Sequence, residues 1–318
     1  MVSFILKRMG LMFIILFLVS VIIFSLVNVL PGDPALLILG QEASPEAVET
    51  LRQEMGLNDP LYVQYFRWVT DVLHGDLGNS YVDNTAVTEI LMQKIPVTLE
   101  LTVISFLIAF FISIPAGIIS ASRKGTLLDY TSTLFALSGV SIPPFFLGIL
   151  LIFIFAIGLG WFAPSGYVPF AQDPVQSLLL MILPAVTVGI RLSAELTRML
   201  RSSLLEVLQS DYIRTGYAKG LRERGVIFGH ALRNALIPVI TVSGLQVGTF
   251  LGGAVITETI FAVPGLGQLV VNSILTRDFP VVQGAVMFMA FAVVFINFVV
   301  DLLYSFLDPR IKLAGGTK

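Results

Sequence analysis

The chain has 318 residues, of which 56% are hydrophobic and 13% are charged, and its mean hydropathy is +0.90. Water-soluble domains carry about 25% charged residues, so this composition excludes an ordinary soluble protein and predicts a membrane protein. The net charge of −2 says little about partners because the charges are segregated, and the lack of cysteine excludes disulfides, thiolate metal sites and a cysteine nucleophile.

The N-terminal segment predicts a retained membrane span. Residues 9–30 are uncharged and follow Lys7 and Arg8. About 20 apolar residues cross a bilayer as a helix, whereas a signal peptide has a shorter apolar core and a small-residue cleavage site, which does not follow here. We therefore expect a first span with a cytoplasmic N-terminus, ending at "LPGDP", where the prolines break the helix.

Residues 31–97 predict a small helical subdomain outside the membrane. They hold ten acidic and three basic residues. The stretch "SPEAVETLRQEMGL" has Ser44 as N-cap, Pro45 at the first helical position and Gly56 as C-cap. The stretch "LYVQYFRWVTDVLHG" predicts a second, amphipathic helix with an aromatic stripe.

The rest of the chain predicts five more spans, which gives an all-α fold with six transmembrane helices. These spans are expected at 101–122, 130–158, 177–190 with a helical extension into water, 234–257 and 279–300. The uncharged stretch 130–172 is long enough for two crossings, but we favour one, followed by the outer loop "GWFAPSGYVPFAQDP". Residues 259–276 are broken by "VPGLG" and predict a re-entrant or interfacial helix.

The charge distribution agrees with six spans and both termini inside. In that topology the inner segments hold 15 of the 19 basic residues and 7 of the 21 acidic ones. Short loops follow the positive-inside rule, whereas the long 31–97 segment is weaker evidence because long segments cross regardless of charge. The predicted domains are the first span with its N-terminal segment at 1–30, the extracytoplasmic subdomain at 31–97, a five-helix core at 98–310 with a cytoplasmic loop at 199–233, and a cytoplasmic tail at 311–318.

One basic segment stands between the fourth and fifth spans. The stretch "DYIRTGYAKGLRERGVIFGHALRNALIP" (211–238) holds five of the 19 basic residues. Ile213, Gly216, Tyr217, Gly220 and Leu221 fall at helical spacing, which predicts one apolar face of a short helix, flattened by glycine so that another protein can approach. Two interpretations are open: a lever that a soluble partner pushes, or an ordinary positive-inside loop with an interfacial helix.

The same segment resembles the coupling motif of importer permeases in ATP-binding-cassette (ABC) systems. Gly220 fits the glycine of that motif, although Arg214, Thr215 and Gly216 replace its EAA residues and "HALR" (230–233) replaces its I-x-L-P. These departures resemble the dipeptide, oligopeptide and nickel permeases, which carry "DYIRTARAKGL…HALRNALIPV" where this chain has "DYIRTGYAKGL…HALRNALIPV". Similar stretches cover nearly the whole chain: "LPGDP", "GLNDPLYVQY", "HGDLGNS", "PVTLELT", "TETIFAVPGLGQLVVNSILTRDFPVVQG" and "NFVVDLLYSFLDPRI".

The resemblance implies a type I ABC importer permease in the cytoplasmic membrane of a bacterium or archaeon. It implies a second, homologous permease subunit as a heterodimer partner, two ABC ATPase subunits and an extracytoplasmic substrate-binding protein. The chain lacks a G-x-x-x-x-G-K-[ST] loop, since Val226 follows Gly225 where lysine would stand, so a partner is expected to hydrolyse ATP. No catalytic group, metal site, bound cofactor or nucleic-acid contact is expected. The implied coupling residues are Asp211, Tyr212, Ile213, Arg214, Gly216, Tyr217, Ala218, Lys219, Gly220 and Leu221.

Further residues are candidates for the pathway, its gate or the binding protein. Prolines inside spans permit kinks, and small polar residues inside spans serve either as interhelical hydrogen bonds or as substrate contacts. Arg191 and Glu195 are spaced to form an ion pair or to line the inner mouth of the pathway. The candidates for the pathway or gate are Ser138, Ser141, Pro143, Arg191, Glu195, Pro264, Gly265 and Gly267. Tyr62, Tyr65 and Trp68 could dock the binding protein, or the outer subdomain could be a purely structural cap.

The predicted function is the ATP-driven import of peptides. The same scaffold could import nickel chelates, glutathione or another small solute, because substrate choice in this family lies largely in the binding protein. An ion-gradient-driven transporter would need charged residues deep in the spans, and the six predicted span centres lack them. A channel is disfavoured because no filter motif is present.

Overall fold

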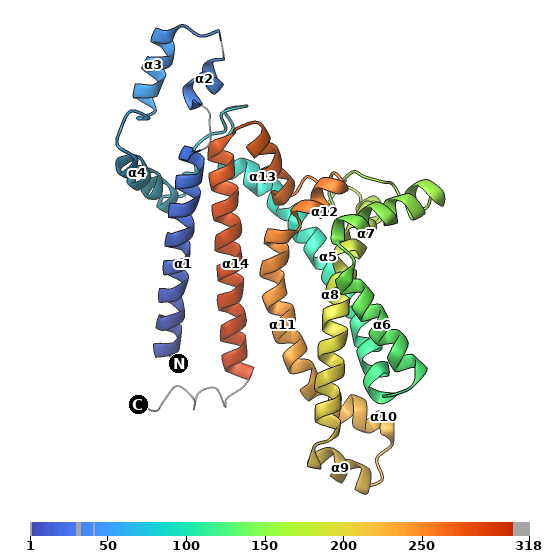
Figure 1. The fold of residues 1–318 in the computed structure, drawn as a ribbon. Helices are drawn as coiled ribbons and strands as arrows, with labels where there is room; N and C mark the ends of the chain where they lie inside the picture. Colours follow the sequence, from blue (N-terminus) through green and yellow to red (C-terminus); the bar gives the residue numbers. More distant parts are fainter. Residues whose placement is uncertain (1, 30–32, 41, 308–318) are drawn as a thin grey trace. The chain divides into compact units, whose positions relative to one another are not determined.

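The computed structural model describes residues 2–29, 33–40 and 42–307, and nearly all of them lie in helices (Figure 1). Among these described residues, five helices are long and apolar enough to cross a membrane, and one bent helix pair makes a sixth if it is counted as a single span. The predicted all-α fold is therefore confirmed, with five or six candidate spans. The chain divides into two compact units, which are described in turn.

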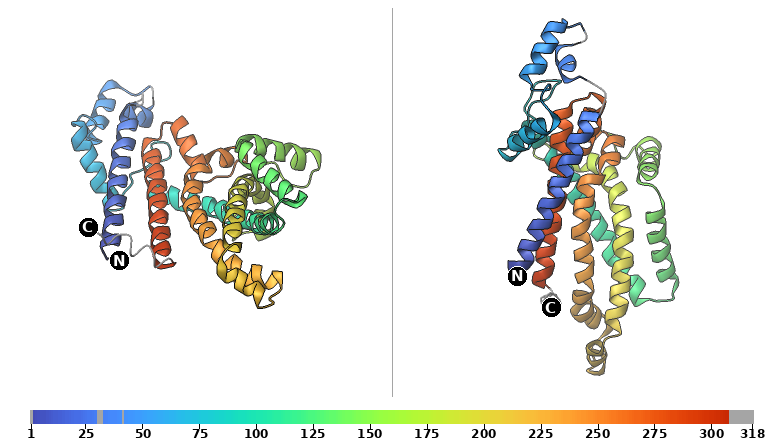
Figure 2. Two further views of the ribbon diagram at one scale, coloured as in Figure 1. Left: turned by 60° about the horizontal axis from the view of Figure 1, so that its bottom comes forward. Right: turned by 60° about the vertical axis from the view of Figure 1, so that its left-hand side comes forward.

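The first unit combines the N-terminal part of the chain with its last two helices. It comprises Met1–Thr98, Leu251–Val255 and Pro264–Lys318. Its helices are α1 (Val2–Val29), α2 (Pro34–Leu39), α3 (Pro45–Glu54), α4 (Leu61–Leu73), the first part of α5 (Val87–Ser122), α13 (Leu266–Leu275) and α14 (Phe279–Leu307). α1 and α14 lie side by side (Figures 1 and 2). A 3.0 Å ion pair between Arg8 and Asp301 joins them.

The acidic segment after α1 contains the two predicted short helices, α3 and α4, and also the unpredicted helix α2. The Ser44 hydroxyl accepts a hydrogen bond from the Ala47 N–H at 3.3 Å, and Pro45 is the first residue of α3. Gly56 follows that helix with a φ of +64°, a conformation that glycine adopts without strain. The helix signals at both ends of α3 were therefore readable from the sequence.

The first turns of α5 belong to the core of this unit. α5 begins at Val87, well before residue 101, where the sequence predicted the span to start. Val87 and Leu91 are buried together with Leu266, Val281 and Ala285 of the C-terminal helices. The prediction missed this because the first turns of α5 carry polar residues that are typical of a loop.

The second unit holds the remaining helices. It comprises Leu99–Phe250 and Ile256–Val263. Its elements are the rest of α5, α6 (Leu127–Ser141), α7 (Pro144–Leu151), the π-helical segment η1 (Ile152–Gly158), α8 (Pro174–Leu208), α9 (Asp211–Ala218), α10 (Glu223–Val226), the π-helical segment η2 (Ile227–Ala231), α11 (Leu232–Gly253) and α12 (Val255–Ile260).

The third predicted span is broken, not continuous. α6 ends at Ser141, and α7 and η1 leave it at an angle of 105°. Pro143 and Pro144 cause the break because neither has an N–H to donate, and a residue before proline avoids the helical region. Ile142 is accordingly extended, with a ψ of 123°, and Pro144 starts α7. The kink that the prolines within the predicted crossing at 130–158 permit is therefore present, as a break between α6 and α7.

α8 is the central helix of the second unit. Leu192, Leu196, Leu200 and Leu204 recur every four residues along it and are at most 1% exposed. They form one buried cluster with residues of α5, α9, α10, η2 and α11: Ala109, Ala121, Ile213, Val226, Ala231, Ala235 and Val239. This cluster fixes the position of every element that carries the predicted coupling residues.

Candidate coupling surface and transport pathway

The predicted coupling segment forms the short helix α9, rooted in the core by a single side chain. Ile213 is 1% exposed and belongs to the buried cluster around α8. The Ser210 hydroxyl, before the helix, donates to the Val207 carbonyl at 2.6 Å, which ties α9 to the end of α8. α9 is therefore anchored through Ile213 and through the end of α8, and its other side chains are accessible.

Gly220 ends α9 by its backbone conformation. Its φ is +78°, its N–H donates to the Tyr217 carbonyl at 2.9 Å, and the Leu221 N–H donates to the Gly216 carbonyl at 3.3 Å. This pair of bonds is the Schellman termination of a helix, in which a left-handed residue after the last turn satisfies free carbonyls. Glycine is favoured there because a Cβ makes that conformation costly.

The predicted single apolar face of this helix is not formed. α9 stops at Ala218, so Gly220 and Leu221 lie beyond it, and the chain reverses at Gly220. Ile213 points into the core, whereas Tyr217 and Leu221 are 45% and 43% exposed. The spacing argument failed because it continued the helix through a glycine that terminates it.

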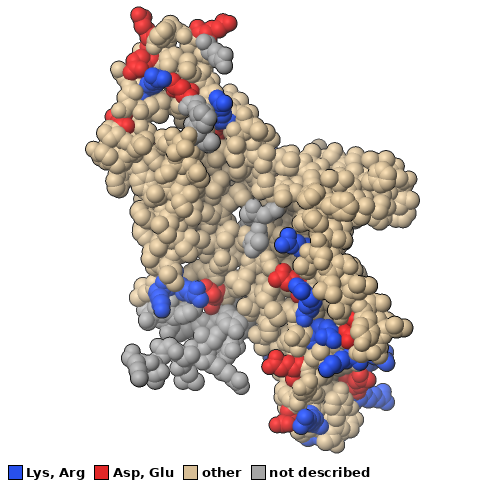
Figure 3. All heavy atoms as spheres, in the orientation of Figure 1, with Lys and Arg blue, Asp and Glu red and all other residues tan. Residues whose placement is uncertain are grey.

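Most of the predicted coupling residues nevertheless share one accessible surface, which we call the α9 surface. Among the predicted set only Ile213 and Gly216 are not exposed. The exposed members are Asp211, Tyr212, Arg214, Tyr217, Ala218, Lys219, Gly220 and Leu221. The Tyr212 hydroxyl accepts a 2.8 Å hydrogen bond from the Asn234 side chain at the start of α11. In Figure 3 charged side chains gather over α9, α10 and the adjoining end of α8.

A second charged feature runs along α8. Arg191, Glu195 and Arg198 are spaced by four and three residues, which places them on one side of the helix. Arg191 and Arg198 are exposed, and Glu195 is half-buried. We call these three residues the α8 stripe.

The predicted ion pair between Arg191 and Glu195 is absent. The Glu195 carboxylate instead accepts a 2.7 Å hydrogen bond from the Gln246 side chain of α11. Gln246 is the lone uncharged amide in the middle of the apolar run 234–257, a signal that the sequence reasoning passed over. This bond joins α8 to α11, two helices that are both candidate membrane spans.

The other pathway candidates near the helix break do not face the chain's own bundle. Ser138, Ser141 and Pro143 are all exposed. The Ser141 hydroxyl donates to the Leu137 carbonyl at 2.8 Å, within its own helix. These side chains therefore make no interhelical hydrogen bond within the described residues.

The gate candidates lie in a tight turn of the first unit. Gly265 precedes α13 and is buried, as is Gly267, while Pro264 is half-buried. A Cβ on Gly267 would come within 2.6 Å of the Val255 Cα, so α13 can approach Val255, a residue of the same unit, this closely only with glycine at that position. The glycine pair thus serves close packing in this structure.

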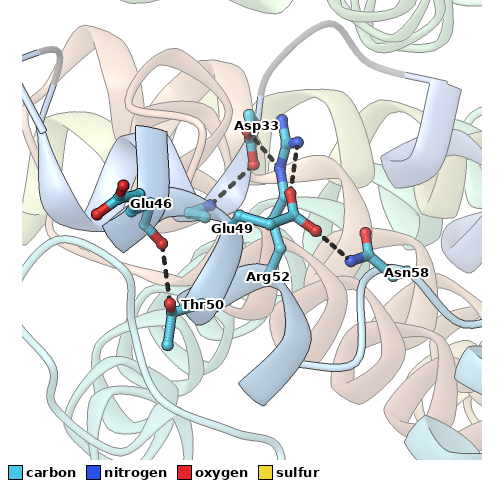
Figure 4. Close-up of polar contacts among 7 residues, drawn as sticks. Asp33, Glu46, Glu49, Thr50, Arg52 and Asn58 are labelled. Carbon is cyan, nitrogen blue, oxygen red and sulfur yellow. Dashed lines mark hydrogen bonds and ion pairs between the residues drawn. The ribbon is translucent and has the colours of Figure 1, made fainter. Parts of the chain in front are cut away.

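The outer subdomain has a charged network around Arg52, a separate Arg67–Asp59 ion pair, and an aromatic contact with α1. The Arg52 guanidinium lies between Asp33 and Glu49, donating to Asp33 Oδ2 at 2.9 Å and to Glu49 Oε2 at 3.4 Å (Figure 4). Asn58 donates to the other oxygen of Glu49 at 2.8 Å. The Arg52 side chain holds the pKa of the Asp33 carboxyl below its usual range.

The docking candidates of this subdomain differ in accessibility. Tyr65 and Trp68 pack on Phe24 of α1, with ring centroids 5.4 and 6.0 Å away, and the Tyr65 hydroxyl is hydrogen-bonded to Ser20 at 2.8 Å. Tyr62 is 66% exposed. Of the three, only Tyr62 is therefore presented to a partner, and the other two hold α4 against α1.

Two carboxylates that the sequence reasoning missed lock loops in place. Asp278 accepts hydrogen bonds from the Ser80 hydroxyl at 2.5 Å and the Tyr81 N–H at 3.0 Å. Burial raises the pKa of Tyr81 to about 12, and the nearby Asp278 charge adds to the effect.

In the second unit, Asp129 forms a bidentate ion pair with Arg201 of α8, at 2.8 and 2.9 Å. Asp278 bonds Ser80 and Tyr81 and Asp129 pairs with Arg201, all far away in the sequence, so sequence spacing alone did not reveal these contacts.

Together, the candidate spans and the broken helix define the class of protein as a polytopic membrane protein. Two family models cover the chain. "Binding-protein-dependent transport system inner membrane component" matches residues 113–313, and the N-terminal component of the same system matches residues 1–102. The chain therefore belongs to the family of binding-protein-dependent transport system inner membrane components.

Relatives are similar over their full length. The dipeptide transport system permease protein DppB of Alkalihalophilus pseudofirmus is 41% identical, covering 98% of this chain and 100% of its own. The glutathione transport system permease protein GsiC of Escherichia coli is 41% identical over 98% of this chain and 99% of its own. The MetNI methionine ABC transporter, in an inward-facing conformation, shares the fold: the TM-score is 0.57 at 19% identity, over 69% of this chain and 96% of that one. The resemblance drawn from the sequence is thus confirmed.

Proposed function

We propose that this permease imports peptides, as one of two homologous pore subunits that form a heterodimer. Two ABC ATPase subunits bind the α9 surface and hydrolyse ATP, and an extracytoplasmic binding protein delivers the peptide. The chain itself contributes no catalytic group and binds no cofactor. Both termini and the α9 surface lie on the cytoplasmic side. Relatives named as dipeptide and glutathione permeases support a peptide-like substrate.

The α9 surface carries the coupling part of this proposal. A coupling element must transmit force, so it has to be anchored at its base and exposed at its tip. Ile213 supplies the anchor in the core around α8, while Tyr217 and Leu221 supply exposed apolar contact area. An ordinary surface loop would not need a buried anchor of this kind.

The topology can be tested by labelling single cysteines, because the natural chain has none. Lys219→Cys on the α9 surface is expected to react with a membrane-impermeant maleimide only after the cells are opened. Tyr62→Cys in the outer subdomain is expected to react in intact cells. Labelling of Lys219→Cys from outside intact cells would contradict the proposed placement.

The coupling role can be tested with a matched pair of tyrosines. Tyr217 and Tyr130 are both exposed, at 45% and 66%, but only Tyr217 lies on the α9 surface. Truncation of an aromatic interface residue often costs more than 1 kcal/mol of binding, or about fivefold in affinity. Tyr217→Ala is expected to weaken ATPase-subunit binding by about fivefold or more and to slow peptide uptake, whereas Tyr130→Ala is not. Equal effects of the two substitutions would refute the assignment.

Substrate class is tested by uptake into proteoliposomes that contain the whole complex. ATP-dependent uptake of a labelled dipeptide or tripeptide is expected, with none in the absence of the ATPase subunits. Uptake of glutathione or a nickel chelate with no peptide uptake would show that the permease imports one of the alternative substrates. Uptake driven by an ion gradient without ATP would contradict the proposal as a whole.

A further inference from the structure

The α8 stripe is a set of charges without matching countercharges. The described residues offer neither Arg191 nor Arg198 an ion pair or a side-chain hydrogen bond. The only acid on the stripe, Glu195, is bonded to the neutral Gln246. The stripe therefore carries one net positive charge that no described residue neutralises.

The depth of the stripe makes that excess charge informative. Glu195 of α8 and Gln246 of α11 both lie within candidate membrane spans, so the bond between them joins two spans. Arg191 follows about one helical turn, or roughly 5–6 Å, toward the N-terminal end of α8. An arginine at such a depth is costly in lipid and is found facing protein or a water-filled cavity.

The side of α8 that carries the stripe is not its packed side. The buried leucines at 192, 196, 200 and 204 form one ridge, and Arg191 and Glu195 each precede a ridge residue by one position. Successive helix positions differ by about 100°, so the stripe lies to one side of the ridge and not beneath it. Arg198, one helical turn after Glu195, is exposed, as is Arg191.

We propose that the α8 stripe lines the water-filled pathway and binds the carboxylate of the passing solute, with Arg191 as the principal contact. The guanidinium group offers a planar pair of N–H donors that matches the two oxygens of a carboxylate. Glu195, held by Gln246, faces the solute one turn away and limits how tightly the anion is retained. This rests on the proposed function, and it defines the substrate class as solutes with a free carboxylate, which excludes bare metal cations.

The test changes both the protein and the solute. The whole complex in proteoliposomes is given two labelled tripeptides that differ only in a free or an amidated C-terminus. Uptake rates are measured for wild type, Arg191→Gln, Arg191→Lys and Glu195→Gln. Lys124→Gln, an exposed cation in the turn after α5, serves as the control. Because the binding protein is the same in every sample, its own preference cancels in the ratio of variant to wild type for each peptide.

The expected result is selective for the free carboxylate. Arg191→Gln should slow uptake of the free tripeptide by about tenfold and of the amide by less than twofold, because a charge-assisted hydrogen bond is lost only with the carboxylate. Arg191→Lys should recover part of the loss, and Glu195→Gln should raise the apparent affinity for the free tripeptide. Lys124→Gln should match wild type with both peptides.

Several outcomes would overturn the proposal. An equal loss with both tripeptides would mean that Arg191 pairs with an acid of the second permease subunit or supports the structure. No loss with either would mean that the stripe does not face the pathway. Co-purification of the ATPase subunits with each variant shows that the complex has assembled, so a folding failure is recognised separately. If the wild-type complex takes up neither peptide, the proposed function fails, independently of the stripe.

Discussion

Replacement of Gly220 separates a backbone role from a surface role at the coupling helix. Gly220 has a φ of +78°, and a Cβ built there meets nothing within 4 Å. Gly220→Ala therefore adds no clash, and its cost is conformational. A left-handed backbone costs an ordinary residue about 1 kcal/mol or slightly more, and asparagine less than alanine. Gly220→Trp carries the same backbone cost and also places a large ring on the α9 surface.

The size of the expected effect follows from that energy. A cost of about 1 kcal/mol lowers the affinity of the ATPase subunits for the permease about fivefold, because α9 must regain its native end to bind. We expect Gly220→Asn to lose less than Gly220→Ala, and Gly220→Trp to lose the most. The assays are a titration of labelled ATPase subunits onto the purified permease and peptide-stimulated ATP hydrolysis in proteoliposomes.

Gly225 supplies the control for this experiment. It lies in α10, also with nothing within 4 Å of a Cβ, but without a positive φ. Gly225→Ala should be neutral or slightly stabilising, because alanine is preferred in a helix by about 1 kcal/mol. The argument would be refuted if Gly220→Ala bound the ATPase subunits like wild type, or if Gly225→Ala lost as much as Gly220→Ala.

Three other predictions follow from local contacts. Gly267→Ala is expected to lower unfolding stability by about 1–3 kcal/mol in a thermal melt, because α13 must move away from Val255; a melting temperature equal to wild type would contradict this. Asp129→Asn is expected to cost about 3 kcal/mol of stability by leaving Arg201 unpaired, and a double-mutant cycle measures the coupling. The depressed pKa of Asp33 stabilises the outer subdomain above about pH 4, and this stability is lost as pH falls through the lower, folded-state pKa. The protection of the outer helices against hydrogen exchange should fall as this stability is lost. In Asp33→Asn this protection should not change over the same pH range.

What the sequence could predict depended on the range of the interaction. The span lengths, the Ser44 cap and the proline break are local, so the residues that cause them stand together in the chain. The bond between Glu195 and Gln246 joins residues 51 positions apart, and only the packing of α8 on α11 brings them together. The sequence therefore suggested a pair within one helix where the structure forms one between two helices.

The coupling helix was misread for a different physical reason. Its glycines were taken as space for a partner, an idea that considers the side chain alone. In the structure the φ of Gly220 decides where the helix ends, and only then which side chains are exposed. The end of α9 depends on backbone dihedrals that apolar spacing does not encode.

α8 connects the two proposed sites in one element. It runs for 35 residues, or about 52 Å, which exceeds the roughly 30 Å of hydrocarbon that it has to cross. Its buried leucine ridge packs on α9 through Ile213, and the adjacent side carries the α8 stripe. Arg201, on the same helix between the two, is fixed to α6 through Asp129. A displacement of α9 by the ATPase subunits would therefore move the carboxylate site without an intervening hinge, because no break in α8 separates them.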